Sequence, residues 1–182
     1  MSESAAEFAA APDGLERLWT PYRMAYIDSH NDGSPEPECP FCAAPGKSDE
    51  DGLIVYRGET CYVVLNLFPY SPGHVLVCPY RHVADYTDLT DAERVEVGEL
   101  TAAAMRTLRA VSQPHGFNIG MNQGDVAGAG IAKHLHQHIV PRWFGDANFF
   151  PIIAQTKAIP QLLGDTRERL AAVFGHCGDT AQ

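Results

Sequence analysis

Histidine occupies every second position from 134 to 138 in the run His134-Leu-His-Gln-His138-Ile-Val-Pro-Arg142. Side chains alternate between the two faces of a β-strand, so this spacing predicts a strand over residues 134–142 with three imidazoles on one face. Leu135 and Gln137 then point to the other face. Each imidazole has polar nitrogens that need partners, and three of them in a row are an unusual pattern for a hydrophobic core.

The rest of the chain carries alternating strand and helix signals. Strands are expected at residues 53–56, 61–67, 74–78 and 117–122, where β-branched and aromatic residues gather. Thr90 and Glu93 form a capping box that opens a helix ending near Gln113, just before Pro114. A second helix is expected from about 159 to 174. This order predicts an α+β fold, a mostly antiparallel sheet with one long helix and a C-terminal helix.

Composition limits the kind of partner that the chain can have. The 182 residues are expected to form one domain over residues 15–175, between a disordered N-terminal tail (1–14) and a C-terminal tail (176–182). A net charge of −10 argues against a nucleic-acid partner. No segment approaches the roughly 18 apolar residues of a membrane span, so no membrane partner is expected. Five unevenly spaced cysteines favour a reduced, cytoplasmic protein.

Three interpretations of the histidine run compete. Structural histidines are one, although clusters of buried polar groups are rare without a function. A mononuclear metal site is another, but such sites usually include a carboxylate, and Asp146 is the first acid after the histidines. The third is nucleophilic catalysis on phosphorus, in which a neutral imidazole attacks and its neighbours supply protons. A loop with Gly124, Gly128 and Gly130 precedes the run and offers N–H groups to a phosphate, so we favour the third interpretation.

A cysteine pair, Cys39-Pro-Phe-Cys42, interrupts the proline-rich stretch 28–51, which is predicted to be a loop. The spacing of the pair suits two ligands of a tetrahedral zinc ion. Two free thiols in a loop are equally compatible with it. Redox chemistry is less favoured, because no helix clearly begins at Cys42 to lower the pKa of its thiol.

Residues His134–Val140 resemble the histidine-triad signature, in which three histidines alternate with apolar residues, although Gln137 departs from it. The similarity extends to residues 66–82, 120–124 and 127–131 and covers about residues 15–170. Residues 18–24 and 145–149 are similar to those of the bacterial diadenosine-tetraphosphate phosphorylases within this family. The resemblance implies the histidine-triad (HIT) fold and a homodimer or higher homo-oligomer.

The resemblance also implies roles for individual residues. His136 would attack the α-phosphorus and form a nucleotidyl-histidine, while His138 and His74 would complete the catalytic set. The residues expected to bind the nucleotide or its phosphates are Asn66 (ribose), Asn122, Ala129, Gly130, Ile131, His138 and Arg142. Because Gly130-Ile131 stands where many family members carry a serine, backbone N–H groups rather than a hydroxyl are expected to contact the phosphate.

The implied substrates are a dinucleoside polyphosphate or adenine nucleotide and inorganic phosphate, with diadenosine tetraphosphate giving ATP and ADP. Hydrolysis of dinucleoside polyphosphates or of nucleoside phosphoramidates is one alternative, and a non-catalytic nucleotide-binding module is another. The resemblance further implies a closed structural zinc site formed by Cys39, Cys42, His82 and His134. No organic cofactor is expected.

Overall fold

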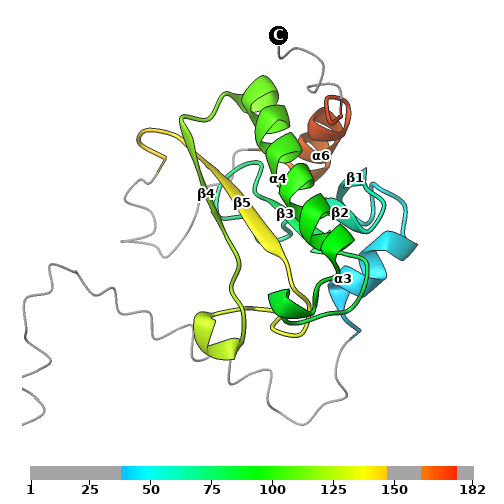
Figure 1. Ribbon diagram of the computed structural model, residues 1–182. Helices are drawn as coiled ribbons and strands as arrows, with labels where there is room; N and C mark the ends of the chain where they lie inside the picture. Colours follow the sequence, from blue (N-terminus) through cyan, green and yellow to red (C-terminus); the bar gives the residue numbers. More distant parts are fainter. Residues whose placement is uncertain (1–37, 147–160, 176–182) are drawn as a thin grey trace, which may run out of the picture. The chain divides into compact units, whose positions relative to one another are not determined.

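A computed structural model describes residues 38–146 and 161–175 of the chain (Figure 1). Five strands form one sheet in the order β1 (Ile54–Arg57), β2 (Cys61–Leu65), β3 (Val75–Pro79), β5 (Gln137–Arg142) and β4 (Gly116–Gly120), with every neighbouring pair antiparallel. The helices are α3 (Pro40–Ala43), α4 (Asp91–Ser112) and α6 (Leu163–Ala171), and the short 3₁₀ turns are η1 (Ala44–Gly46), η2 (Tyr86–Asp88) and η3 (Asp125–Ala127). The predicted α+β class is confirmed.

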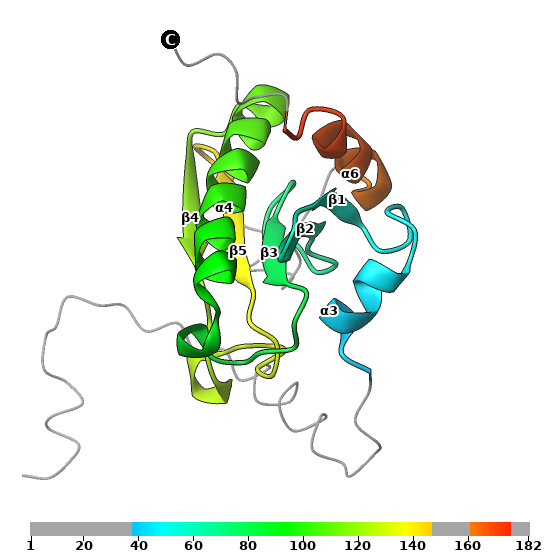
Figure 2. The same ribbon diagram turned by 45° about the vertical axis from the view of Figure 1, so that its right-hand side comes forward.

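The long helix α4 begins and ends where its sequence signals predict. The Thr90 side chain accepts a hydrogen bond from the Glu93 N–H, and the Glu93 carboxylate accepts one from the Thr90 N–H. Gln113 ends the helix in the left-handed conformation. The apolar face, Val97, Leu100, Ala104 and Leu108, is buried against β2, β3 and β5. Burial of each of the larger side chains, Val97, Leu100 and Leu108, contributes about 1.5–3 kcal/mol, so this face fixes α4 across the sheet (Figure 2).

The two faces of the central strands have different roles. Val75, Val77 and Ile139 belong to the core under α4. Because side chains alternate, His74, Leu76 and His138 point to the opposite face. There Leu76 packs in a second core cluster with Tyr62, Val64, Cys78, Ala44 and Ile54. The opposite face of the sheet is therefore apolar over β2 and carries imidazoles toward β5.

The strand that holds the histidines is shorter than predicted. β5 begins at Gln137, so His134, Leu135 and His136 lie before it. The β3–β5 ladder stops at the pair Val77–Gln137, close to the end of β3 at Pro79. The Leu135 N–H donates instead to the Val83 carbonyl at 2.7 Å, which draws this segment away from the ladder.

Other predicted boundaries shift by a few residues. The strand predicted at 61–67 ends at Leu65, and the one predicted at 117–122 covers Gly116–Gly120. The C-terminal helix begins at Leu163 within the described residues. Some predictions lie outside the described residues. They are the tails at 1–14 and 176–182, the domain boundary at 15, and residues 159–160 of the predicted helix. None of the described helices has the length and apolar character needed to cross a bilayer.

Candidate active site and metal centre

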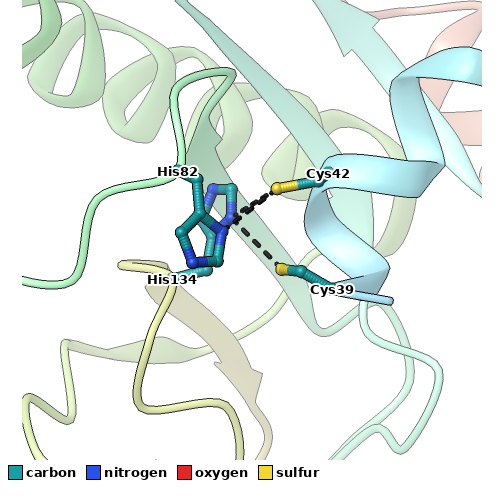
Figure 3. A group of neighbouring side chains, drawn as sticks. All are labelled: Cys39, Cys42, His82 and His134. Atoms are coloured by element: carbon teal, nitrogen blue, oxygen red, sulfur yellow. Dashed lines mark hydrogen bonds between the residues drawn. The ribbon is translucent and has the colours of Figure 1, made fainter. Parts of the chain in front are cut away.

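Two cysteines and two histidines converge beside the sheet (Figure 3). Cys39 is the residue just before α3 and Cys42 lies within it, while His82 follows β3 and His134 precedes β5. The Cys42 Sγ lies 3.1 Å from His82 Nδ1 and 3.5 Å from His134 Nδ1, and the Cys39 Sγ lies 3.4 Å from His134 Nδ1. All four potential ligand atoms lie within 4.8 Å of one another. The cluster can hold a metal ion.

The separations fit one tetrahedral ion. Zn–S bonds of about 2.3 Å and Zn–N bonds of about 2.05 Å imply S···N separations of about 3.6 Å, close to those observed. The His134 Nε2–H donates to the Pro79 carbonyl at 2.9 Å, which leaves the Nδ1 lone pair aimed at the cluster. Burial lowers the pKa of His134, which keeps this imidazole neutral and able to bind a metal.

The loop predicted around the cysteines contains a short helix. Pro40 occupies its first turn, where the missing N–H of proline costs no hydrogen bond. The pKa of the Cys42 thiol is raised, chiefly by burial, so the short helix does not activate it as a redox thiol. The Tyr62 hydroxyl donates to the Phe41 carbonyl at 2.7 Å and ties the helix to β2.

His136 lies next to this cluster and is almost completely buried, with 5% of its surface exposed. Its Nδ1–H donates to the backbone carbonyl of His134 at 2.8 Å. This bond assigns the proton to Nδ1 and leaves a lone pair on Nε2. Burial lowers the pKa of His136, so the imidazole stays neutral at pH 7. A neutral imidazole with an unprotonated Nε2 is a nucleophile.

His74 and His138 form a hydrogen-bonded chain with a fixed direction. The backbone N–H of Tyr70 donates to His74 Nδ1 at 3.1 Å, and since this donor cannot accept, the His74 proton lies on Nε2. His74 Nε2–H then donates to His138 Nδ1 at 2.9 Å. A neutral His138 therefore carries its own proton on Nε2. Burial, with a smaller effect of nearby His136, lowers the pKa of His138 to about 4.

Local sequence explains how His74 reaches this position. Gly73 has φ +78°, a conformation that favours glycine, and a Cβ there would crowd Leu108 Cδ2 at 3.0 Å. The Ser71 hydroxyl donates to the Pro141 carbonyl at 2.7 Å and holds the turn against β5. The turn between β2 and β3 thus delivers His74 to His138.

Aromatic rings border the imidazoles. The centroids of His136 and His138 lie 4.9 Å apart. The ring of Tyr70 lies 5.9 Å from that of His138, with 9° between their planes. The ring of Phe41 lies 4.9 Å from that of His136. Neither aromatic residue was expected from the sequence, although Phe41 stands between the two cysteines and Tyr70 stands four residues before His74.

The predicted nucleotide-binding residues differ in how the fold places them. Gly120 pairs with His138, so the loop after β4, with Ala129, Gly130 and Ile131, begins beside the imidazoles. Asn122 Nδ2 donates to the Gly128 carbonyl at 3.4 Å and braces that loop. Asn66, at the end of β2, accepts from the Phe68 N–H at 3.0 Å through its side-chain oxygen. Its side-chain nitrogen lies 3.3 Å from His74 Nδ1.

Arg142 is not brought to the imidazoles. It lies four residues beyond His138, a span of about 13 Å along a strand. Its guanidinium forms an ion pair with Asp146, with Nε 2.6 Å from the carboxylate, and donates to the Asn118 side chain at 2.8 Å. The interpretation of Arg142 as a phosphate ligand is therefore unsupported by its position.

A cavity of about 280 Å³ lies elsewhere, on the α4 side of the sheet. Its lining includes Gly73, Leu108, Val111, Trp143, Arg169 and Leu170. None of the predicted catalytic, nucleotide-binding or metal-binding residues lines it. The chemistry of the chain is thus concentrated on the opposite face, where the imidazoles gather.

This arrangement, with a nucleophilic imidazole beside a second histidine pair on an antiparallel sheet, defines a histidine-triad protein. A family model described as the HIT domain matches residues 47–145. The chain therefore belongs to the HIT family.

Curated relatives extend the match beyond this domain. An AP-4-A phosphorylase of Mycobacterium tuberculosis is 53% identical over 164 residues, which cover 87% of this chain and 84% of that protein. An asymmetrical bis(5'-nucleosyl)-tetraphosphatase of Schizosaccharomyces pombe is 35% identical over 89 residues, 49% of this chain and 48% of that protein.

Solved structures agree with the fold. A zinc-bound histidine triad family protein from Mycobacterium smegmatis has a TM-score of 0.59 and 26% identity, and the match covers 74% of this chain and 91% of that one. A histidine triad nucleotide-binding protein from Sulfolobus tokodaii also has a TM-score of 0.59, covering 79% of this chain and 99% of that one. At 24% identity the second likeness concerns the fold alone. The predicted HIT fold is confirmed.

Proposed function

We propose that the protein is a nucleotidyltransferase that cleaves diadenosine tetraphosphate by phosphorolysis, with His136 as the nucleophile. One observation carries the proposal: the His134 carbonyl holds the Nδ1 proton of a buried, neutral His136, which leaves Nε2 available to attack phosphorus. The 53% identical relative named AP-4-A phosphorylase supports the choice of substrate and of phosphate as the second acceptor.

The reaction takes place in two displacements. His136 Nε2 attacks the α-phosphorus, the bond to the bridging oxygen breaks, and ATP leaves while AMP remains on the imidazole. An oxygen of inorganic phosphate then attacks the same phosphorus, the P–N bond breaks, and ADP leaves with His136 restored. His138 Nε2–H points its proton toward the phosphate oxygens that gain charge, and His74 holds His138 in that tautomer.

Binding the nucleotide in a chain of net charge −10 requires local donors. We assign this role to Asn66 at the ribose, to Asn122, and to the backbone N–H groups of Ala129, Gly130 and Ile131 at the phosphates. Arg142 has no part in this assignment. We also propose that the protein acts as a homo-oligomer.

The ion at the cysteine–histidine cluster is proposed to be zinc. Two thiolates and two imidazoles are a common ligand set for structural zinc, and they leave no open position for substrate. The zinc-bound Mycobacterium smegmatis neighbour supports the choice. In this assignment the first histidine of the run, His134, serves the metal and the next, His136, serves the reaction.

One assay tests the proposal. The purified protein is incubated with diadenosine tetraphosphate, with and without inorganic phosphate, and the products are separated by chromatography. ATP and ADP that form only with phosphate support phosphorolysis. ATP and AMP at the same rate without phosphate would identify a hydrolase, the second candidate, which the tetraphosphatase relative favours. Binding of AMP without any cleavage would identify a non-catalytic module.

A further inference from the structure

Phe41 connects the metal centre to the nucleophile. It lies between Cys39 and Cys42 in the sequence, so the two cysteines bracket its backbone. Its ring lies 5.5 Å from that of His134, edge to face, and 4.9 Å from that of His136, tilted by 43°. The same side chain therefore contacts one residue of the metal cluster and the proposed nucleophile.

The helix that carries Phe41 has little stability of its own. α3 contains four residues and none of them is buried, while a helix this short is unstable in isolation. The Tyr62 hydroxyl holds its backbone at the Phe41 carbonyl. Two cysteines bound to one ion would fix the same turn from both sides, because the metal–sulfur bonds would restrain the residue after Phe41 and the residue two positions before it.

Besides its contact with the ring of His138, His136 has two contacts that come from the metal-cluster side. The bond from its Nδ1–H to the His134 carbonyl restrains one edge of the ring. The ring of Phe41 restrains one face. The first contact is made by His134, a residue of the metal cluster. The second is made by Phe41, which lies between the cluster residues Cys39 and Cys42. Both contacts therefore depend on how well ordered the cluster is.

We propose that Phe41 is a positioning residue for His136 and that metal binding by Cys39 and Cys42 fixes the ring of Phe41 against it. The metal centre then sets the geometry of the nucleophile without touching substrate. The kinetic part of this inference rests on the proposed function, whereas the structural part does not.

Three proteins test the kinetic part: Phe41→Ala, Phe41→Leu and the control Tyr56→Ala. Tyr56 is also aromatic and partly exposed, but it lies on the edge strand β1 and stacks on Phe174 of the core under α4. Phe41→Ala should keep its metal, since no ligand atom is lost, and kcat should fall by about tenfold or more with little change in KM. Phe41→Leu should recover part of kcat through its apolar bulk, and Tyr56→Ala should keep both constants.

The opposite kinetic pattern would overturn the proposal. A raised KM with unchanged kcat would assign Phe41 to substrate binding alone. Loss of metal from Phe41→Ala would mean that the ring supports the cluster rather than the nucleophile. If Phe41→Ala does not fold, Phe41→Leu carries the same comparison, because it still removes the aromatic face.

A spectroscopic test needs no turnover. In the metal-loaded wild type, nuclear Overhauser contacts between the rings of Phe41 and His136 should be present, and ¹⁵N shifts should show the proton on His136 Nδ1. After chelation the contacts should weaken, and added zinc should restore them, while circular dichroism follows the fold. Contacts that persist unchanged in folded, metal-free protein would overturn the proposal. A wild type that shows these contacts but cleaves no dinucleotide would refute only the proposed function.

Discussion

The Glu93 carboxylate receives two hydrogen bonds from the guanidinium of Arg81, at 3.1 Å from Nε and 2.8 Å from Nη2. Arg81 immediately precedes His82, one of the four clustered ligands, and Glu93 lies in the first turn of α4. The same Arg81 donates to the Asp88 carbonyl at 2.7 Å. The pair thus anchors the segment after β3, which contains His82 of the cysteine–histidine cluster, to the start of the long helix.

We expect this pair to make stability depend on acid. The bonds from Arg81 hold the pKa of Glu93 at about 2, below its ordinary value. A lowered carboxyl pKa adds stability that is complete above the unfolded value, near 4.5, and is lost as pH falls through about 2. Glu93→Gln keeps an N-cap partner for Thr90 but removes the charge, so it should lower the free energy of unfolding by about 1–3 kcal/mol at pH 7. Urea titrations at pH 7 and pH 3 measure this, and an equal loss at both pH values would contradict it.

Replacement of the nucleophile should separate binding from chemistry. His136→Ala is expected to abolish turnover while AMP binds with nearly unchanged affinity, because the lost group acts in bond making. His115→Ala is the matched control, since His115 contacts Phe144 rather than the triad. Product analysis and calorimetry provide the two measurements. Near-normal turnover in His136→Ala would end the assignment.

Metal content should follow the four clustered ligands. Freshly purified protein is expected to carry about one zinc per chain, and Cys39→Ala should lose most of it. Cys61→Ala should keep the metal, because Cys61 is buried in the core under α4. Elemental analysis decides the matter, and protein that neither contains zinc nor takes it up would contradict the prediction.

Loss of the Asn66 side chain should act mainly on nucleotide binding. Asn66→Ala removes one proposed hydrogen bond to ribose, which costs about 0.5–1.5 kcal/mol and raises the dissociation constant accordingly. Asn118→Ala is the control, because Asn118 contacts Arg142 at the far end of β5. Fluorescence titration with a nucleotide measures both variants. An unchanged dissociation constant would place the ribose elsewhere.

The sequence predicted the parts of this fold that depend on local patterns. The capping box at Thr90 and the helix end at Gln113 were confirmed because each involves residues a few positions apart. The predicted start of the histidine strand, at residue 134, was wrong. The strand begins where its pairing with β3 begins, and β3 ends about 60 residues earlier in the sequence. The alternation of side chains along a strand predicts which face of the sheet each one lies on. It does not predict where the hydrogen-bonded pairing with the next strand ends.

The candidate site could be predicted only in part. From spacing alone, Cys39 and Cys42 were equally compatible with free thiols, since their proposed partners lie 40 to 95 residues away. Arg142 was expected at the phosphate because it is close to the histidines in sequence, but four residues along a strand span about 13 Å, and its guanidinium pairs with Asp146. Phe41 was missed because an aromatic ring between two cysteines has no local signal that tells which residues it will contact.

The chain of donors from Tyr70 through His74 to His138 has a polarity that a backbone amide enforces. Neither His74 nor His138 can change its tautomer unless the hydrogen bond from the Tyr70 N–H to His74 Nδ1 is broken. The site accordingly offers a hydrogen to its substrate and offers no lone pair at His138 Nε2. A ligand oxygen that carries no hydrogen can accept the hydrogen bond from His138 Nε2–H. A hydroxyl or amino hydrogen directed at Nε2 would instead be repelled by the hydrogen on that nitrogen. Under the proposed function, His138 would therefore favour an ionised phosphoryl oxygen over a protonated one.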